Sequence, residues 1–314
     1  MKKEIPIFFA CDDNYIPLLG NALYTLLKHA SEDYHYTVIV LNAGLKKRNK
    51  ERIKEFETKH DNLTVKFANI SKLINEHYTD LAYRLRDYYS VAIYFRMFIP
   101  TMFPEYDKAI YLDADLILVG DISELYNTNI EGKLVAAIND KLVSSVPTFA
   151  AYANNAVGIS ADEYFNSGVL VMNLKKFRED DIETKFLDLL KTYNFDTVCP
   201  DQDYLNVLCR NDKVLLHTGW NKMPLEEPGF DYTTLKLLHY NSFEKPWHYD
   251  HVRYGDKFWE ESAGSPFYED LLKIRNSVDE NHIKKGKQGA AALLEKALYL
   301  AEQDEGTFKK TLAL

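Results

Sequence analysis

Apolar segments of strand-like composition alternate with helical segments along the first half of the chain. These segments are rich in β-branched and aromatic residues, which fit a pleated, buried surface. They cover residues 5–10, 38–41, 63–67, 109–112, 134–138 and 169–172, with a further one at 235–238. Helical patterns follow Pro17 and cover residues 46–59, 180–192 and 202–209. The alternation predicts an α/β fold with a mostly parallel central sheet flanked by helices.

The segment at 109–112 is followed by two aspartates, Asp113 and Asp115. Side chains two positions apart on a strand point to the same face, so the two carboxylates converge. Like charges this close repel each other unless a shared proton or a cation relieves them, and hard oxygen ligands suit Mg²⁺ or Mn²⁺. The alternative is a solvated turn. Asp121 is interpreted as the N-cap of the next turn, because Asp121 and Glu124 have capping-box spacing.

The composition argues against two classes of partner. The 314 residues are 46% hydrophobic and 27% charged, and the formal net charge is −9. Binding to nucleic acid or to anionic lipid needs a basic surface, so neither is expected beyond weak peripheral membrane association. The first residues turn polar too soon for a signal peptide, no stretch approaches the roughly 20 apolar residues of a membrane span, and the three cysteines lack metal-finger spacing. We therefore expect a cytoplasmic protein with reduced thiols.

Polar residues follow several of the expected strands. Asp12 and Asp140 come after strand-like segments, and Asn166 lies in an expected turn, 166–168, before another strand. Ligands of open parallel sheets bind beyond the carboxyl ends of the strands, so these residues should converge on one crevice with Asp113. No G-x-G-x-x-G follows the first strand, so a dinucleotide fold is unsupported.

Two further segments carry candidate ligand-binding groups. Asn14 and Tyr15, with Asp12, could contact the edge and ring of a base, and a turn leading into a helix N-cap is the alternative. Arg96 lies in an apolar segment that we expect to be helical over 90–98 and to end at Pro100. A cation there needs an anionic partner, either a ligand or a site aspartate, unless it points to the surface.

The segment after residue 238 contains His239 and Lys245. An imidazole directly after a strand can complete a metal shell and favours Mn²⁺ over Mg²⁺, whereas a hydrogen-bonded core histidine is the alternative. We interpret Lys245 as a mobile, solvent-facing charge that can reach a phosphate. Asp201 and Gln202 follow Pro200, where a helix begins. Their polar groups could contact a sugar, or the acidic residue could simply favour the helix dipole.

Together these segments resemble glycosyltransferase family 8, the retaining transferases that use UDP-hexoses. The resemblance extends from Ile5 to about Tyr249, and any one motif is weak whereas their combination in this order is highly specific. The matching segments are 10–15 (ACDDNY), 94–96 (YFR), 111–115 (YLDAD), 165–170 (FNSGVL), 201–203 (DQD), 220–221 (WN) and 239–247. The family's last motif, H-x-x-G-x-x-K-P-W, has Ser242 in place of its glycine here.

The resemblance implies a nucleotide-binding, Rossmann-like fold of the glycosyltransferase A type and a metal-dependent retaining hexosyltransferase. Galactose or glucose would move from a UDP-sugar to a glycan or glycolipid acceptor. By position in the motifs, Asp113, Asp115 and His239 would hold Mn²⁺ or Mg²⁺. Residues at the donor would be Ala10, Asp12, Asn14, Tyr15, Arg96, Asp113, Ala114, Ser242 and Lys245. Residues around the reacting sugar would be Asp140, Asn166, Asp201 and Gln202.

Residues 1–280 are expected to form the nucleotide-diphospho-sugar transferase domain, and residues 281–314 a helical C-terminal tail. The stretch 284–289 (KKGKQG) predicts a flexible joint before a short helix over 290–303. Two other functions remain open at this point. One is a haloacid-dehalogenase-like phosphatase, which also has a D-x-D after a strand, and the other is a non-catalytic or self-glycosylating UDP-sugar-binding protein.

Overall fold

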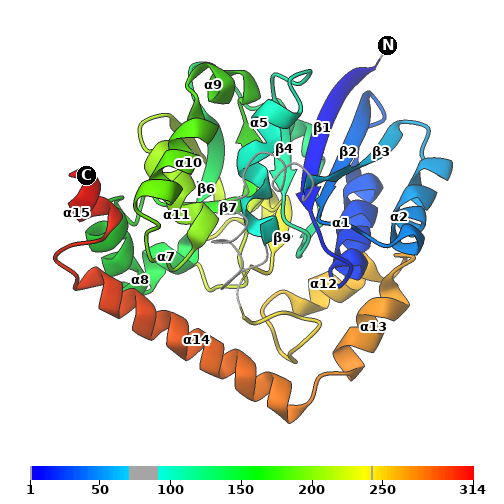
Figure 1. Cartoon of the computed structure of the whole chain (residues 1–314). Helices are drawn as coiled ribbons and strands as arrows, with labels where there is room; N and C mark the ends of the chain where they lie inside the picture. The colour runs from blue at the N-terminus through cyan, green and yellow to red at the C-terminus, as the bar shows by residue number, and fades with distance from the viewer. Residues whose placement is uncertain (1, 71–90, 242) are drawn as a thin grey trace.

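The computed structural model describes residues 2–70, 91–241 and 243–314, and these residues form a seven-stranded central sheet beside a two-stranded sheet (Figure 1). The strand order in the large sheet is β3-β2-β1-β4-β7-β6-β8, and β5 pairs with β9 in the small one. The strands are β1 (Lys3–Ala10), β2 (Tyr34–Asn42), β3 (Leu63–Asn69), β4 (Ala109–Leu112), β5 (Leu116–Leu118), β6 (Val135–Asn139), β7 (Phe165–Met172), β8 (Lys213–Leu216) and β9 (Leu237–His239). The predicted α/β architecture is confirmed.

Strand β7 runs antiparallel to both of its neighbours, β4 and β6, whereas β1–β4 are mutually parallel and β8 is parallel to β6. The prediction that residues 166–168 form a turn before this strand is wrong, because they lie inside β7. Asn166 is paired with Ile138 of β6. Since β7 is reversed, its first residues lie at the same sheet edge as the carboxyl ends of the parallel strands. Asn166 therefore reaches the expected crevice from the start of a strand.

Apolar side chains cover both faces of the sheet, and β4 illustrates how. Its four residues are almost completely buried, and they alternate between the two hydrophobic clusters of the protein: Ala109 and Tyr111 belong to one, Ile110 and Leu112 to the other. This is the period of two that a strand imposes on its side chains. A strand buried on both faces therefore needs an unbroken apolar segment, and the sequence provides one.

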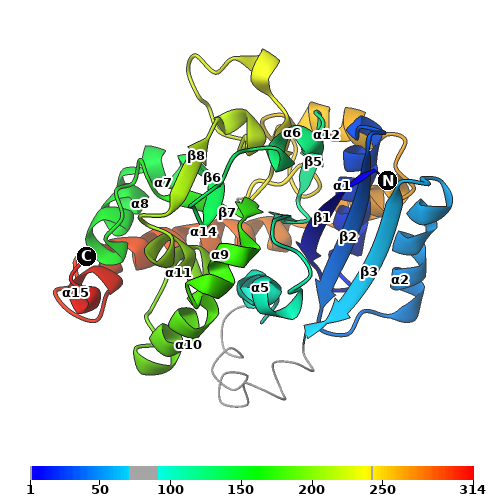
Figure 2. The ribbon, with the colours of Figure 1, turned by 90° about the horizontal axis from the view of Figure 1, so that it is seen from above.

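Helices pack on both faces, as Figure 2 shows with α1 and α2 on one side of β1–β3 and α5 on the other. The helical segments are α1 (Ile16–His29), α2 (Lys47–Lys54), η1 (Glu55–Thr58), η2 (Val91–Phe98), α5 (Ile99–Met102), α6 (Ile122–Tyr126), α7 (Lys141–Ser145), α8 (Pro147–Tyr152), η3 (Ala153–Val157), α9 (Leu174–Glu179), α10 (Ile182–Thr192), α11 (Pro200–Leu208), η4 (Thr218–Trp220), η5 (Tyr232–Thr234), α12 (Gly255–Ser262), α13 (Tyr268–Asn276), α14 (Glu280–Ala301) and α15 (Phe308–Leu312).

Two local predictions about these helices have different outcomes. Asp121 is the N-cap of α6, and its carboxylate accepts a hydrogen bond from the backbone N–H of Ser123, as predicted. Pro100 does not end the segment before it: η2 is a 3₁₀ helix that continues into α5, and Pro100 lies in the first turn of α5. A proline is tolerated there because the first N–H groups of a helix have no intrahelical acceptor. Ser90, the first residue of the predicted helix, lies outside the described residues.

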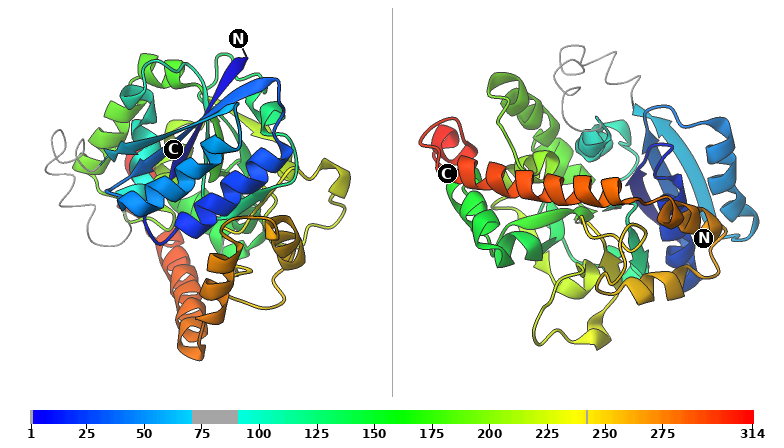
Figure 3. Two further views of the ribbon diagram at one scale, coloured as in Figure 1. Left: turned by 90° about the vertical axis from the view of Figure 1, so that its right-hand side faces the viewer. Right: turned by 90° about the horizontal axis from the view of Figure 1, so that it is seen from below.

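The C-terminal helix α14 is longer than predicted and runs across the underside of the molecule from α13 to α15 (Figures 1 and 3). The predicted flexible joint at 284–289 is wrong, because this stretch is continuous helix. Two helical glycines cost about 1 kcal/mol each relative to alanine. Packing offsets this cost, since α14 lies against α8 and the short π-helix η3, with Ala297 and Leu300 buried.

None of the helices in the described parts of the chain is long and apolar enough to span a bilayer. The cytoplasmic location and the division into residues 1–280 and 281–314 remain predictions.

The close contact between α1 and the residue before α13 generates a stability prediction. A Cβ on Gly20 would lie 2.2 Å from ring carbons of Phe267, and this ring is 1% exposed with the Arg52 guanidinium 4.2 Å above it. Gly20→Ala should therefore lower the free energy of unfolding by roughly 1–3 kcal/mol through overpacking, less the ~1 kcal/mol that alanine gains in a helix. Denaturant titration measures this loss.

The control is Gly255→Ala in α12, where the nearest atoms to a new Cβ lie 3.6 Å away, an ordinary contact distance. This variant should be as stable as the wild type or slightly more stable. Equal stability of both variants would contradict the packing argument.

Candidate functional site

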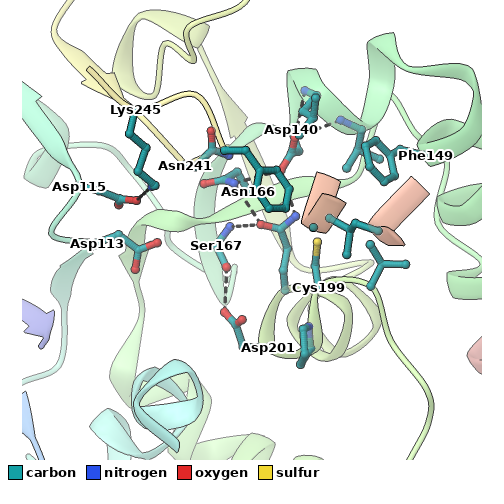
Figure 4. A pocket seen from close by; sticks show the side chains of 18 of the residues that line it. Asp113, Asp115, Asp140, Phe149, Asn166, Ser167, Cys199, Asp201, Asn241 and Lys245 are labelled. Carbon is teal, nitrogen blue, oxygen red and sulfur yellow. Dashed lines mark hydrogen bonds and ion pairs between the residues drawn. The ribbon is translucent and has the colours of Figure 1, made fainter. Parts of the chain in front are cut away.

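A cavity of about 760 Å³ opens at the edge of the sheet where β4 and β6 end and β7 begins (Figure 4). Of the residues predicted for the site, those that line it are Tyr15, Arg96, Asp113, Asp115, Asp140, Asn166, Asp201, Gln202 and Lys245. They come from seven separate segments between residues 15 and 245. The predicted convergence of strand-end polar residues on one crevice is therefore observed.

Asp113, Asp115 and His239 form one group whose ligand atoms all lie within 4.8 Å of one another. Strand pairing in the two sheets brings these three side chains together. Asp113 follows β4 and its N–H donates to the carbonyl of Gly168 in β7, at 2.8 Å. The pairing of β5 with β9 sets Leu116 opposite His239, so the imidazole arrives beside the two carboxylates. Two carboxylates and one imidazole are a ligand set that suits a divalent cation.

Gly168 makes room for this group. A Cβ at this position would lie 2.3 Å from Cε1 of His239 and 2.5 Å from Oδ2 of Asp113. No side chain larger than hydrogen fits without moving His239 or Asp113. The glycine in the segment 166–168 is therefore required by the close approach of the strand to the side chains of Asp113 and His239, and not by a turn.

The orientation of His239 also fits a cation. Asn221 donates through Nδ2 to Oδ1 of Asn166 at 2.9 Å, so its Oδ1 is the acceptor that faces Nδ1 of His239 at 2.9 Å. The proton of a neutral imidazole is then on Nδ1, and Nε2 points a lone pair at Oδ1 of Asp115, 3.1 Å away. A lone pair facing a carboxylate is unfavourable unless the ring is protonated or a cation lies between them. The donor set therefore fits a metal ion that is shared by Asp115 and His239.

Arg96 and Lys245 supply positive charge to the carboxylates. Arg96 is 4% exposed and pairs with Asp113 at 3.0 Å and with Asp201 at 3.2 Å, so a site aspartate rather than the surface is its partner. Lys245 Nζ lies 2.5 Å from Asp115, and the lysine side chain is 15% exposed. The prediction of a solvent-facing Lys245 is wrong. Burial alone would raise the pKa of Asp115, but the ammonium of Lys245 holds it below its usual value.

A second group, of side-chain amides and carboxylates, lies next to the first. Asp140 caps α7 by accepting from the N–H groups of Leu142 and Val143 through Oδ1. Its Oδ2 accepts from Asn166 Nδ2 and Gln202 Nε2, each at 3.0 Å. The oxygen of Gln202 accepts from Asn166, so the three side chains hold one another in place. Each donor and acceptor is fixed before any ligand arrives.

Asp201 and Gln202 are presented by the first turn of α11, next to β7. Asp201 accepts from the hydroxyl of Ser167 at 2.8 Å, and burial raises its pKa although Arg96 opposes the rise. Ser167 was not predicted as a site residue. It also donates its N–H to Gln202 at 2.9 Å and its carbonyl accepts from Arg96. Its position inside the matched segment 165–170 was the one feature of the sequence that could have indicated this role.

Asp203, one residue further along α11, belongs to the matched segment 201–203 but was not among the residues placed at the site. Its carboxylate is fully buried and accepts hydrogen bonds from the hydroxyls of Tyr164 at 2.6 Å and Tyr152 at 2.7 Å. It accepts a third from the N–H of Cys199, which precedes α11. Burial raises the pKa of Asp203 to about 7, although these hydrogen bonds act to lower it. Asp203 therefore fixes the start of the helix that carries Asp201 and Gln202.

The loop after β1, residues 12–15, forms the turn that the sequence offered as an alternative, and it also places one side chain at the cavity. Asp12 accepts from the N–H groups of Asn14 and Tyr15, which makes a turn leading into α1. Tyr15 nevertheless lines the cavity and is 42% exposed. Ala10 at the end of β1, Asp12 and Asn14 lie on this edge outside the cavity wall, as does buried Ala114. Ser242 lies outside the described residues.

Comparison with known proteins identifies the family. A family model described as "Glycosyl transferase family 8" matches residues 6–251 of this chain. The chain belongs to glycosyltransferase family 8. It is therefore a glycosyltransferase, and the phosphatase alternative is not supported.

Two relatives match most of the chain. General stress protein A of Bacillus subtilis is 25% identical over 295 residues, which are 90% of this chain and 97% of that protein. A lipopolysaccharide 1,2-glucosyltransferase of Escherichia coli K12 is 26% identical over 87% of this chain and 82% of its own.

The fold agrees with that of solved structures. The galactosyltransferase LgtC, in complex with donor and acceptor sugar analogues, superimposes with a TM-score of 0.66 at 24% identity, over 90% of this chain and all of LgtC. The bifunctional glycosyltransferase WbbM has a TM-score of 0.74 at 24% identity, and the match spans 88% of this chain but only 52% of WbbM. The glycosyltransferase A fold predicted from the motifs is therefore confirmed.

The environment of Asp203 predicts a pH dependence of stability. The raised pKa means that the folded protein binds a proton that the unfolded chain, with a pKa near 3.8, does not hold at the same pH. The stabilisation from this proton is complete below that unfolded-state pKa and is lost as the pH rises through about 7. Asp203→Asn should flatten this fall in the unfolding free energy between those two pH values.

Denaturant titrations at several pH values, with Asp162→Asn at an exposed position as the control, measure the effect. An unchanged slope in Asp203→Asn would show that other groups cause the pH dependence.

Proposed function

We propose that this family 8 enzyme is a metal-dependent retaining hexosyltransferase that moves galactose or glucose from a UDP-hexose to a glycan or glycolipid acceptor. The observation that carries the proposal is the chain of contacts from His239 through Asn221 to Asn166, which joins the metal-ligating group to Asp140 and Gln202. A diphosphate held at one end would place its sugar at the other. The relatives named as glucosyl- and galactosyltransferases support a hexose donor.

Asp113, Asp115 and His239 are proposed to hold Mn²⁺, or Mg²⁺ as the second choice, since a nitrogen ligand favours the former. The ion would supply Lewis acidity at the oxygens of the departing diphosphate. Two features of the chain support this assignment: Gly168 leaves room for Asp113 and His239 to come close, and the Nε2 lone pair of His239 faces Asp115.

Lys245 is proposed to stabilise the UDP leaving group. Its ammonium lies against Asp115 and the carbonyl of Tyr240, at 2.5 and 2.6 Å. A charge that is held in place before the reaction stabilises developing negative charge without reorganisation. We propose that Asp12, Asn14 and Tyr15, with the backbone near Ala10 and Ala114, contact uridine. The residue at 242 would lie against the diphosphate.

Retention of configuration is proposed to come from attack on the same face as the leaving group. Gln202 is a poor nucleophile because its amide is neutral, and both of its ends are held by Asp140, Asn166 and Ser167. The bond from the anomeric carbon to UDP breaks as the sugar becomes oxocarbenium-like. The acceptor oxygen then bonds to that carbon, and its proton passes to the departing UDP oxygen. Asp140 and Asp201 would orient sugar hydroxyls.

The metal assignment predicts that UDP release requires a divalent cation. We expect slow UDP release from UDP-galactose or UDP-glucose with Mn²⁺, and none in excess chelator. Asp115→Asn should lower the turnover, because a weaker metal ligand removes several kcal/mol of transition-state stabilisation. A coupled assay for UDP across a panel of UDP-sugars measures both effects, and full activity in chelator would contradict the assignment.

Lys245 provides a second test. Lys245→Ala should lower kcat by roughly 10²–10³-fold, the range found when one preorganised charge stabiliser is lost. The matched control is Lys236→Ala, which removes an ammonium paired with Glu124 at 2.8 Å outside the cavity wall, and it should keep wild-type turnover. Thermal unfolding of both variants separates lost catalysis from lost folding. Normal kcat in folded Lys245→Ala would assign this lysine a structural role.

A further inference from the structure

The cavity continues beyond the polar groups into an end lined by hydrocarbon. This apolar end lies where α7, α8 and the start of α11 meet α14, and Phe149 marks it in Figure 4. Its side chains are Leu142, Val143, Phe149, Val198 and Leu293. Asp140, which we place at the reacting sugar, is two residues before Leu142. The apolar end therefore begins directly beside the proposed reaction centre.

The backbone N–H groups of Leu142, Val143 and Val198 and the two tyrosine hydroxyls near them are already engaged within the protein. The N–H groups of Leu142 and Val143 donate to Asp140, and that of Val198 donates to the hydroxyl of Tyr152. The hydroxyls of Tyr152 and Tyr164, which also line the cavity, donate to Asp203. A sugar hydroxyl placed here would lose its water and find none of these groups free, which is unfavourable. Hydrocarbon has no such cost.

Helix α14 closes this end with one of its faces. His282, Gly286, Gly289 and Leu293 all line the cavity, and their spacing of four, three and four residues puts them on the same side of the helix. The glycines allow a close approach, since a Cβ on Gly286 would lie 2.1 Å from the Tyr249 hydroxyl. A Cβ on Gly289 would lie 3.1 Å from the ring of Phe243.

Contacts at both ends hold α14 in this place. The ring of His282 packs against that of His248, with centroids 4.5 Å apart, in the segment that carries Lys245. Towards its C-terminus, Lys296 pairs with Asp196 at 2.5 Å and Ala297 is completely buried. The helix is thus seated on the cavity by its own side chains, and Leu293 is part of the cavity wall.

We propose that the apolar end is an acceptor subsite for a hydrophobic aglycone, an alkyl or aryl group attached to the sugar that receives the hexose, and that Leu293 of α14 helps to select it. This inference rests on the proposed hexosyltransferase function. An aglycone here would continue from an acceptor hydroxyl beside Asp140 into the space between Leu142 and Leu293. The hydrophobic effect would then add affinity that a bare sugar cannot gain.

The test compares acceptors that differ only in the aglycone. Methyl and n-hexyl β-galactosides and β-glucosides are titrated into the full chain with UDP and Mn²⁺, and transfer from the UDP-hexose is measured in parallel. Each buried methylene is worth roughly a fourfold gain in affinity, so the hexyl glycoside should bind at least about tenfold more tightly than its methyl counterpart. The same ratio is expected in kcat/KM wherever transfer occurs.

Two adjacent leucines provide the matched variants. Leu293 lines the cavity whereas Leu294 is 37% exposed, so Leu293→Ser should reduce the hexyl-to-methyl ratio towards one and Leu294→Ser should leave it at the wild-type value. Leu142→Ser tests the opposite wall, and it decides the question if Leu293→Ser does not fold. The ratio is read within each variant, so a general loss of activity does not alter it.

The outcomes separate the two proposals. Equal dissociation constants for hexyl and methyl glycosides in the wild type, with metal-dependent UDP release intact, would overturn the aglycone subsite alone. The same holds if Leu293→Ser and Leu142→Ser both keep the full hexyl preference. Absence of UDP release from every UDP-hexose with Mn²⁺ would overturn the proposed function and the subsite with it.

Discussion

The buried guanidinium of Arg96 is the contact on which the arrangement of the site depends. It joins Asp113 at the end of β4, Asp201 at the start of α11 and the carbonyl of Ser167 in β7. The flat guanidinium also lies 4.2 Å from the ring centroid of Tyr111, whose hydroxyl donates to Asp113. Removing this cation would leave the buried carboxylate of Asp201 without its charged partner, and breaking a buried pair in this way costs more than the intact pair contributes to stability. Arg96 thereby ties Asp113 to the helix that carries Gln202.

The two halves of the site are also joined by neutral hydrogen bonds. His239, Asn221 and Asn166 form a continuous series that ends at Asp140 and Gln202. Each amide uses both its donor and its acceptor in a single orientation, so a rotation at one position would leave unpaired groups at the next. The group of Asp113, Asp115 and His239 and the group of Asp140, Asn166 and Gln202 are therefore held at a constant separation, and fixed positions of this kind favour transfer between two bound substrates.

Helix α14 shows how a local signal can mislead. Glycines and lysines at 284–289 are typical of a linker, yet the stretch is helical, because the glycines are where the helix meets Tyr249 and Phe243. The sequence shows that glycine has a low helix propensity, but it does not show that Tyr249 and Phe243 leave little room for a larger residue at these positions. Burial of residues such as Ala297 against a distant part of the chain compensates the loss of propensity. One side of this helix lines the cavity.

The sequence by itself determined the fold class, the D-x-D and the family. Strand and helix periods are local, and β4 could be recognised from four consecutive apolar residues followed by Asp113 and Asp115. The set of motif residues that line the cavity was also predictable, since motifs preserve residue type and order. Their bonding partners were not, and Ser167, Asn221 and Asp203 gained no role from the pattern alone.

Only the tertiary structure decided the direction of β7, the pairing of Leu116 with His239 and the seat of α14. Each depends on contacts between residues far apart in the chain, which no local period encodes. Reversal of β7 is what brings Asn166 and Gly168 to the edge where the parallel strands end. The sequence thus determined which chemical groups are available, and packing decided which of them meet. A contact requires two surfaces to fit, whereas the periodic pattern of a segment describes only the surface of that segment.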